Sequence, residues 1–232
     1  MAIREGLTLR QAALIAGFGY LLDPVTYAEF TLYPKLVIPG NIDQTVANIS
    51  SHHALFVAAM FCYLVNFIED IVVAWALYVL LLPVNRSVSL LAALFRIIFA
   101  TIALVGTFNM ATVYRMLTTP EYLSVFGSAQ LHAQVDLLLH SFRINYSLSL
   151  VIFGIHLILV GALIYWSRYM PKWLGIILVI NGLGWIVSEL QPYLWPTANL
   201  GFLFFTYFGE LVFMLWLLIV GWRIKEPAAV LE

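Results

Sequence analysis

The chain has 232 residues, of which 63% are hydrophobic and 10% are charged, whereas ordinary soluble domains are about 45–50% apolar and about 25% charged. This composition excludes a soluble globular enzyme, and the aromatic content of 15% excludes an intrinsically disordered chain. The formal net charge of −1 leaves no basic surface for nucleic acid, and a single cysteine, Cys62, excludes an intrachain disulfide. The sequence therefore predicts an all-α integral membrane protein.

Apolar stretches of membrane-spanning length follow one another through the chain. A hydrocarbon core about 30 Å thick needs a helix of about 20 apolar residues. Six segments meet this requirement, and they are apolar all round, which excludes the alternating pattern of a membrane barrel. We expect a single bundle of six transmembrane helices over residues 1–232, with the helices at about 11–33, 54–82, 88–117, 131–166, 173–194 and 201–222.

The first of these spans contains an interruption at Asp23-Pro24. A proline inside a helix frees the carbonyl four residues earlier, here that of Tyr20. Broken helices near the membrane midplane often line substrate or ion sites. The alternative is an ordinary kink in the helix.

The connections between the predicted spans contain turn-forming residues. Residues 83–86 and 168–172 each combine a proline with basic side chains, so they predict short hairpins on one side of the membrane. Residues 36–51, which include Pro39-Gly40, predict a longer external loop.

The basic residues outside the spans lie mainly on one side of the membrane. They fall in the two ends of the chain and in the second and fourth connections, whereas the alternate connections hold essentially Lys35. By the positive-inside rule, both termini are expected in the cytoplasm. The residues concerned are Arg4, Arg10, Arg86, Arg168, Lys172, Arg223 and Lys225.

Each predicted helix places a polar side chain in the middle third of the bilayer. Counting about 1.5 Å per residue from the cytoplasmic end of each helix places these side chains roughly 12–20 Å deep. Charged groups at this depth cost at least about 2.5–3.5 kcal/mol each, so they are expected to face the bundle interior and to find partners. The candidate ligand- or proton-binding residues are Asp23, Glu69, Asp70, Arg96, His156, Asn181 and Glu210.

The charges in this set do not balance, because four carboxylates face only Arg96 and a proton that His156 can carry. Protonated carboxyls, a bound cation or a water-filled cavity would neutralise the excess. Glu69 and Asp70 point about 100° apart on a helix, so one of them is expected to pair with Arg96. We favour Asp70, although the sequence barely separates the two. The alternatives are a purely structural ion pair for Arg96 and a neutral, packed core histidine for His156.

A second polar layer is expected toward the external surface. Its members are Glu29, Asn109, Arg115, Asp136, His140, Arg143 and Glu189. His132, Asp136 and His140 follow one another at intervals of four, so they share one helix face. Two histidines and a carboxylate suit zinc or a similar divalent ion, and the alternative is an exposed polar face. Haem is not expected, because His156 has no histidine partner at its depth.

Several strings of residues follow the pattern of a known family. They are Ile38-Pro39-Gly40, Thr45-Val-Ala47-Asn48-Ile49, Leu77-Tyr78-Val-Leu-Leu-Leu-Pro83-Val84-Asn85-Arg86, Ala92-Ala-Leu-Phe95-Arg96, Phe153-Gly154-Ile-His156 with Gly161, Pro171 to Gly175, and Gly209-Glu210-Leu211 with Trp216 and Gly221. In these strings the chain resembles, over nearly its whole length, a bacterial membrane-protein family catalogued as domain of unknown function 4386. The resemblance implies a multi-pass helical protein of the bacterial plasma (inner) membrane, and it carries over no activity, substrate or catalytic residue.

Three classes of function remain for such a chain. The first is binding or transport of a small solute, a cation or a proton through a midplane polar cavity, and it ranks highest because unbalanced acids need a counter-charge. The second is a noncatalytic accessory or structural subunit of a homo-oligomer or a larger membrane assembly. The third is an intramembrane enzyme that uses His140 and Asp136 at the outer face, with Glu189 as a further candidate. No nucleotide-binding motif occurs, so the expected partners are the lipid bilayer and a small solute or cation.

Overall fold

The computed structural model describes residues 6–224 of the chain. Within these residues all regular structure is helical, and no strand occurs. Arg4 and Lys225, two of the basic residues used to predict the orientation, lie outside the described residues.

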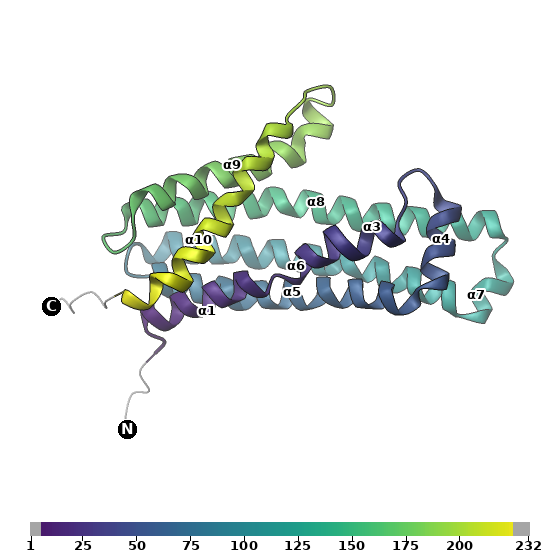
Figure 1. Cartoon of the computed structure of the whole chain (residues 1–232), viewed down its shortest axis with the longest axis horizontal. Helices are drawn as coiled ribbons and strands as arrows, with labels where there is room; N and C mark the ends of the chain where they lie inside the picture. Colours follow the sequence, from purple (N-terminus) through teal and green to yellow (C-terminus); the bar gives the residue numbers. More distant parts are fainter. Residues whose placement is uncertain (1–5, 225–232) are drawn as a thin grey trace. The chain divides into compact units, whose positions relative to one another are not determined.

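Figure 1 labels most of the α-helices, which are numbered in chain order. Three further segments are π-helix (η1) or 3-10 helix (η2 and η3). The elements are α1 (Leu9–Leu22), α2 (Pro24–Tyr27), η1 (Ala28–Leu32), α3 (Tyr33–Leu36), α4 (Ile42–Ser51), α5 (His53–Leu81), α6 (Arg86–Thr118), α7 (Pro120–Val125), α8 (Ser128–Trp166), α9 (Lys172–Leu194), η2 (Gly201–Tyr207), α10 (Phe208–Ile219) and η3 (Gly221–Arg223).

Five helical stretches of the described chain are long and apolar enough to cross a membrane. They are α5, α6, α8, α9 and the continuous segment made of η2 and α10. These stretches indicate a multi-pass membrane protein, and they coincide with the second to sixth predicted spans. The first predicted span differs, because residues 11–33 are divided among α1, α2, η1 and α3 rather than forming one regular helix.

The division of this segment begins at the predicted Asp23-Pro24 interruption. Asp23 has φ −33° and ψ 81°, outside the helical region, and Pro24 opens α2. Proline fits the first turn of a helix because its missing N–H would have no partner there. The chain then widens into the π-helix η1, which the sequence did not predict. Such single π turns occur frequently at functional sites.

The external loop predicted at residues 36–51 contains a helix in its second half. Gly40, at φ 73°, makes the turn that precedes this helix. Asn41 caps α4, because its side-chain oxygen accepts a hydrogen bond from the backbone N–H of Gln44 at 3.0 Å. The helix buries Thr45 and Ile49 on one side. The prediction of a loop was therefore wrong from residue 42 onward.

The described residues form two compact units. Unit 1 consists of residues 6–22, 69–99 and 148–224, and unit 2 consists of residues 23–68 and 100–147. Helices α5, α6 and α8 contribute residues to both units.

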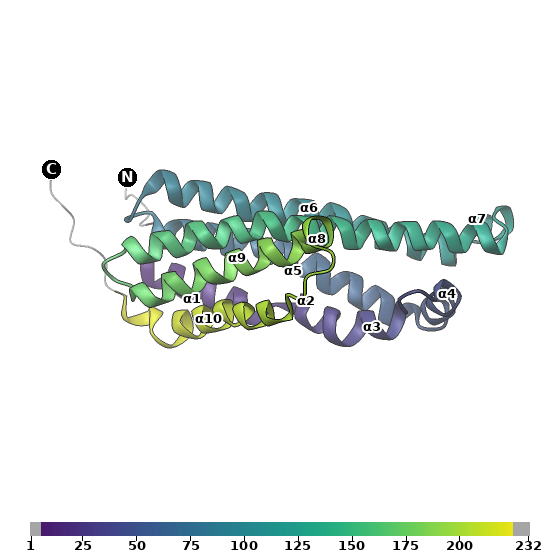
Figure 2. The same ribbon diagram turned by 90° about the horizontal axis from the view of Figure 1, so that it is seen from above.

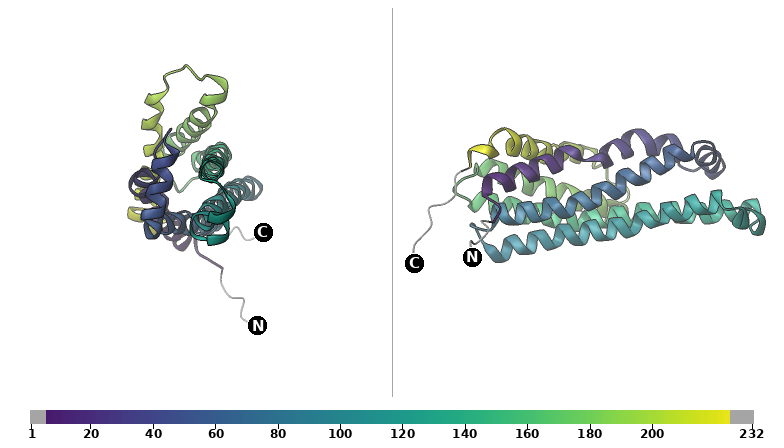
Figure 3. Two further views of the ribbon diagram at one scale, coloured as in Figure 1. Left: turned by 90° about the vertical axis from the view of Figure 1, so that its right-hand side faces the viewer. Right: turned by 90° about the horizontal axis from the view of Figure 1, so that it is seen from below.

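Close contacts between helices hold unit 1 together. Helix α1 packs along α10, as the right-hand view of Figure 3 shows. Helices α8 and α9 run side by side (Figure 2), with Gly154 facing Gly182 and Gly161 facing Gly175. A Cβ atom on any of these glycines would overlap the carbonyl oxygen of the facing glycine. The two backbones therefore touch, as they do in membrane helix pairs built on small residues.

The core of unit 2 is mainly aromatic. Tyr63 on α5 and Phe142 on α8 are fully buried, and their rings meet edge to face with centroids 4.9 Å apart. Tyr33 on α3 and Tyr146 on α8 each pack against Phe142 as well. This cluster packs α3, α5 and α8 of unit 2 together.

Candidate functional site

Arg96 lies at the centre of a polar cluster in unit 1. The residue belongs to α6 and is only 3% exposed. Its Nη2 and Nε atoms lie 2.6 Å and 2.9 Å from the same oxygen, Oδ1 of Asp70 on α5. Its Nη1 donates a hydrogen bond of 2.6 Å to the hydroxyl oxygen of Tyr20 on α1. Asp70 is thus the carboxylate that pairs with Arg96, as the sequence favoured.

His156 on α8 completes the hydrogen bonds of this cluster. Its Nδ1 lies 2.8 Å from the carbonyl oxygen of Ala92. A carbonyl oxygen only accepts, so Nδ1 carries the proton and donates it. Nε2 then has a free lone pair, and it lies 3.4 Å from Nη1 of Arg96, from which it accepts. This geometry suits the neutral imidazole, because a second ring N–H would point at the guanidinium.

Aromatic rings enclose the guanidinium of Arg96. Its Cζ atom lies 4.6 Å from the ring centroid of Tyr20 and 5.3 Å from that of Phe153. The Tyr20 ring in turn meets Phe213 of α10 edge to face, at 5.8 Å between centroids. Desolvated cation–π contacts of this kind contribute about 2 kcal/mol. The cluster therefore joins α1, α5, α6, α8 and α10.

Two further carboxylates act electrostatically on Arg96, those of Glu69 and Glu210. Glu69 on α5 reaches α1 at Gly19, where a side chain would overlap its Oε1 atom. Glu210, in the first turn of α10, accepts a hydrogen bond of 3.1 Å from the indole N–H of Trp185. Of the three carboxylates, Asp70 makes the short contacts to the guanidinium, and Glu69 and Glu210 add negative charge that acts on it.

The structure places the other two candidate residues outside this set of contacts. Asn181 on α9 is fully buried and donates from Nδ2 to the carbonyl oxygen of Thr206 at 2.9 Å. It thereby fixes α9 against η2, which leads into α10. Asp23 belongs to unit 2, where its Oδ2 accepts a hydrogen bond of 2.7 Å from the hydroxyl of Thr26.

Unit 2 contains a second arginine–carboxylate cluster. Nη1 of Arg143 on α8 lies 2.6 Å and 2.8 Å from the two carboxylate oxygens of Glu29, which is part of the π-helix η1. The hydroxyl of Tyr63 donates to the same carboxylate at 2.5 Å. The guanidinium lies over the rings of Tyr33 and Tyr146. The sequence placed Arg143 and Glu29 in one polar layer but did not predict that they pair.

The two histidines of the predicted metal site contact different partners. Nδ1 of His132 lies 2.6 Å from Oδ1 of Asp43 on α4. Nδ1 of His140 lies 2.9 Å from the backbone carbonyl of Asp136 and 3.3 Å from its carboxylate. Within residues 6–224, no three His, Cys, Asp or Glu side chains are arranged to hold a metal ion. The structure therefore does not bring His132, Asp136 and His140 together as a metal site.

The remaining members of the predicted outer layer are distributed over both units. Asn109 and Arg115 belong to unit 2, where Asn109 donates to the carbonyl of Gly106 and Arg115 is exposed. Glu189 belongs to unit 1, where it acts electrostatically on Tyr207.

Three aromatic residues complete these clusters although they were not predicted as site residues. The hydroxyls of Tyr20 and Tyr63 and the indole N–H of Trp185 each bond to a charged side chain. Buried tyrosine and tryptophan need a partner for their polar atom. Each of the three bonds to a charge on a different helical element, so the only signal in the sequence was a polar aromatic residue within an apolar span.

Comparison with known proteins gives two matches and one negative result. The family described as "Domain of unknown function (DUF4386)" matches residues 15–221 of the chain. An uncharacterized protein of Archaeoglobus fulgidus is 36% identical over 159 residues, which cover 68% of this chain and 81% of the relative. No solved structure matches the chain. Because this relative comes from an archaeon, similar chains occur outside bacteria.

Proposed function

The chain belongs to the family described as domain of unknown function DUF4386, and we propose that it binds a proton or a small cation at Glu69 and Glu210. In this proposal α1, α2, η1 and α3 together form a sixth span, and both termini face the cytoplasm. Reversible binding at the two carboxylates is the step that couples the protein to movement of a small solute or cation across the membrane.

The single observation that carries the proposal is the charge count around Arg96. Asp70, Glu69 and Glu210 all act on this one guanidinium, and the hydrogen bonds of His156 suit its neutral form. Three carboxylates minus one guanidinium leave a net charge of −2 when all are ionised. Ionised groups at membrane depth cost several kcal/mol, and uptake of a proton or a cation removes that cost. A membrane protein that keeps such an excess is suited to reversible charge binding.

The Arg96–Asp70 pair has a different role in this proposal. The guanidinium makes short bonds to Asp70 and Tyr20 and lies between two aromatic rings. A side chain held in this way fixes the helices rather than exchanging ligands. We therefore assign the binding to Glu69 and Glu210, and positioning to the pair.

A structural role in a membrane assembly is the second candidate function. The observation in its favour is that the Arg96 cluster already connects α1, α5, α6, α8 and α10. On this view Glu69 and Glu210 serve only to hold helices, through their contacts with Gly19 and Trp185.

Charge-neutral variants distinguish the two candidates. Glu69→Gln, Glu210→Gln and the double variant are purified and reconstituted into proteoliposomes that contain a pH-sensitive dye. Proton movement is measured under an imposed potassium diffusion potential, and uptake of a lipophilic amine is measured in parallel. We expect the wild type to give a signal that each single variant reduces and the double variant loses, because the exchanging carboxylates are gone.

The matched control is Glu189→Gln, which removes a carboxylate of α9 that lies outside the Arg96 cluster. This variant should retain the wild-type signal. Elution profiles and thermal unfolding of all variants show whether they remain folded. Folded Glu69 and Glu210 variants that move protons and amine like the wild type would contradict the proposal and leave the structural role.

A further inference from the structure

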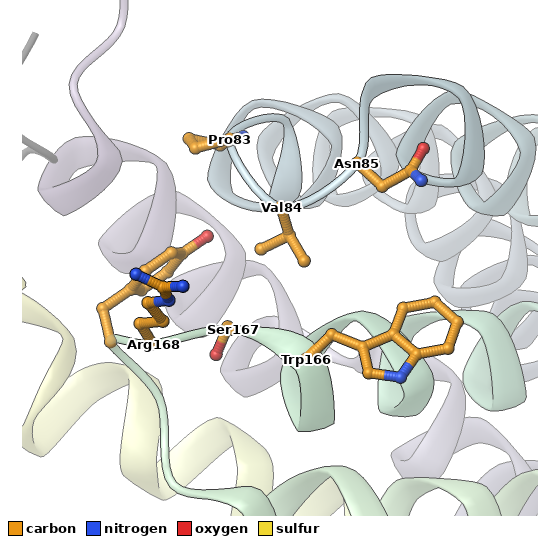
Figure 4. Close-up of a pocket in the computed structure, with 7 residues that line it drawn as sticks. Pro83, Val84, Asn85, Trp166, Ser167 and Arg168 are labelled. Carbon is orange, nitrogen blue, oxygen red and sulfur yellow. The ribbon is translucent and has the colours of Figure 1, made fainter. Parts of the chain in front are cut away.

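A cavity lies where two short connections of unit 1 meet. One wall comes from the connection between α5 and α6, and the other from the connection between α8 and α9. The cavity has a volume of about 440 Å³, and we call it the connection pocket. Figure 4 shows Trp166 and Arg168 on either side of Ser167, with the residues of the first connection opposite them. Its lining residues are Pro83, Val84, Asn85 and residues 166–169.

The connection pocket lies at the level where the chain leaves the membrane. Both connections join helices that are long and apolar enough to span it. They are also short, because α5 ends at Leu81 and α6 begins at Arg86, while α8 ends at Trp166 and α9 begins at Lys172. Trp166 is 59% exposed, and tryptophan is typical of the headgroup level of membrane proteins.

Basic residues line the connection pocket or follow its two connections directly in the chain. Arg168 lines the pocket, and Arg86 and Lys172 directly follow the two connections in the chain. Residues 71–120 and 137–188, which include both connections, contain no Asp or Glu. No carboxylate of the described part of the chain forms an ion pair with Arg168. The pocket therefore offers a cation to a ligand that must bring its own negative charge.

The walls of the connection pocket are held in place without Arg168. The hydroxyl of Tyr169 donates to the carbonyl of Leu80 and so ties the second connection to the end of α5. The side-chain oxygen of Asn85 accepts from the N–H of Val88 at 3.1 Å and fixes the start of α6. The pocket is thus preformed, as most small-ligand sites are.

We propose that the connection pocket binds the phosphate group of an anionic phospholipid. Arg168 pairs with the phosphate, which a guanidinium can contact through two N–H groups at once. Arg86 and Lys172, which follow the two connections in the chain, add positive charge to this end of the helices, and the exposed ring of Trp166 packs against the glycerol and the first part of the acyl chains. This site is separate from Glu69 and Glu210, so it does not depend on the function proposed above.

The test compares lipids and soluble phosphates on the delipidated full-length protein in a neutral detergent. The probes are phosphatidylglycerol, phosphatidylcholine, glycerol 3-phosphate and inorganic phosphate. Native mass spectrometry measures the retained lipid, and thermal unfolding measures stabilisation. We expect phosphatidylglycerol to be retained and to raise the Tm, whereas phosphatidylcholine and the soluble phosphates have little effect.

Variants then locate the site. Arg168→Gln should lower retention of phosphatidylglycerol by about tenfold, because the charge-assisted bonds are lost. Arg168→Lys keeps the charge but not the planar fork, so its retention should lie between those of the wild type and Arg168→Gln. The matched control is Arg223→Gln, because Arg223 is also a basic residue beside a tryptophan but does not line the pocket.

Three results would overturn the proposal. One is equal retention of phosphatidylglycerol by the wild type and a folded Arg168→Gln variant. Another is equal retention of phosphatidylcholine and phosphatidylglycerol by the wild type. The third is an Arg168-dependent Tm shift with inorganic phosphate but no retained phosphatidylglycerol, which would assign the pocket to a soluble phosphate instead of a lipid.

Discussion

The two arginine clusters of the molecule use the same chemical groups at different degrees of burial. In unit 1 the side chains of Arg96 and Asp70 are each 4% exposed. In unit 2 the side chains of Arg143 and Glu29 are 45% and 21% exposed. Both pairs include a tyrosine hydroxyl and aromatic rings around the guanidinium. Because the groups are alike, we expect burial to decide how much each pair contributes to stability.

The largest expected effect comes from removing one partner of the buried pair. Asp70→Asn removes the carboxylate that makes the short contacts to the guanidinium of Arg96, and breaking a buried pair in this way costs about 3–5 kcal/mol. Unfolding by denaturing detergent in mixed micelles measures the change in free energy. The double variant Asp70→Leu with Arg96→Met should recover much of the loss, because it removes both charges of the pair together. If Asp70→Asn lowers the free energy of unfolding as little as the loss of an exposed pair does, the expected difference between the two arginine clusters is wrong.

A smaller effect on stability is expected from alanine substitutions at glycines where two helices pack closely. Gly161→Ala drives a methyl group into the backbone carbonyl of Gly175, whereas the same change at Gly106 of unit 2 meets the Cβ of Asn145 at 3.0 Å. Overpacking costs roughly 1–3 kcal/mol, and the methyl group at Gly161 would lie 2.6 Å from its nearest neighbour, closer than the methyl group at Gly106. Thermal unfolding should therefore show a larger loss for Gly161→Ala. Equal losses of thermal stability in the two variants would show that α8 and α9 pack less closely than the structure indicates.

The smallest effect is expected at the partly exposed pair of unit 2. Arg143→Gln should lower the free energy of unfolding by about 1 kcal/mol or less, as exposed ion pairs do. High salt should reduce the loss further, because it screens exposed charges more than buried ones. Unfolding curves in low and high potassium chloride measure both effects. If the loss is independent of salt, the pair behaves as a buried one and the comparison with Arg96 fails.

The spans could be predicted from the sequence because their signal is local. Runs of apolar residues gave α5, α6, α8 and α9 to within a few residues, and Asp23-Pro24 gave the end of α1. The π-helix η1 was missed, because nothing in its five residues distinguishes a wider turn from a regular one. Helix α4 was missed because Pro39-Gly40 was taken to continue as a loop, although the cap at Asn41 was visible in the sequence.

The site could be predicted only in part, because it depends on which helices become neighbours. Glu69 and Asp70 are neighbours in the chain, so the sequence could not show which of them pairs with Arg96. The packing of α6 beside α5 brings Asp70 to Arg96. The even spacing of His132, Asp136 and His140 suggested a metal site. His132 instead bonds to Asp43 on α4, a helix that the prediction did not contain. Long-range contacts of this kind leave no trace in local spacing.

The hydrogen bond between Asp70 and Arg96 also bears on how the chain enters the bilayer. The two residues are 26 positions apart, on successive helices joined by a tight turn. Because synthesis runs from the amino end, the acid of α5 precedes the guanidinium of α6 in the emerging chain. Helix α5 alone would carry an unmatched charge into lipid, at a cost of about 2.5–3.5 kcal/mol. Insertion as a hairpin delivers both charges already joined, so a nascent chain that stops short of Arg96 should be retained at the translocon or degraded.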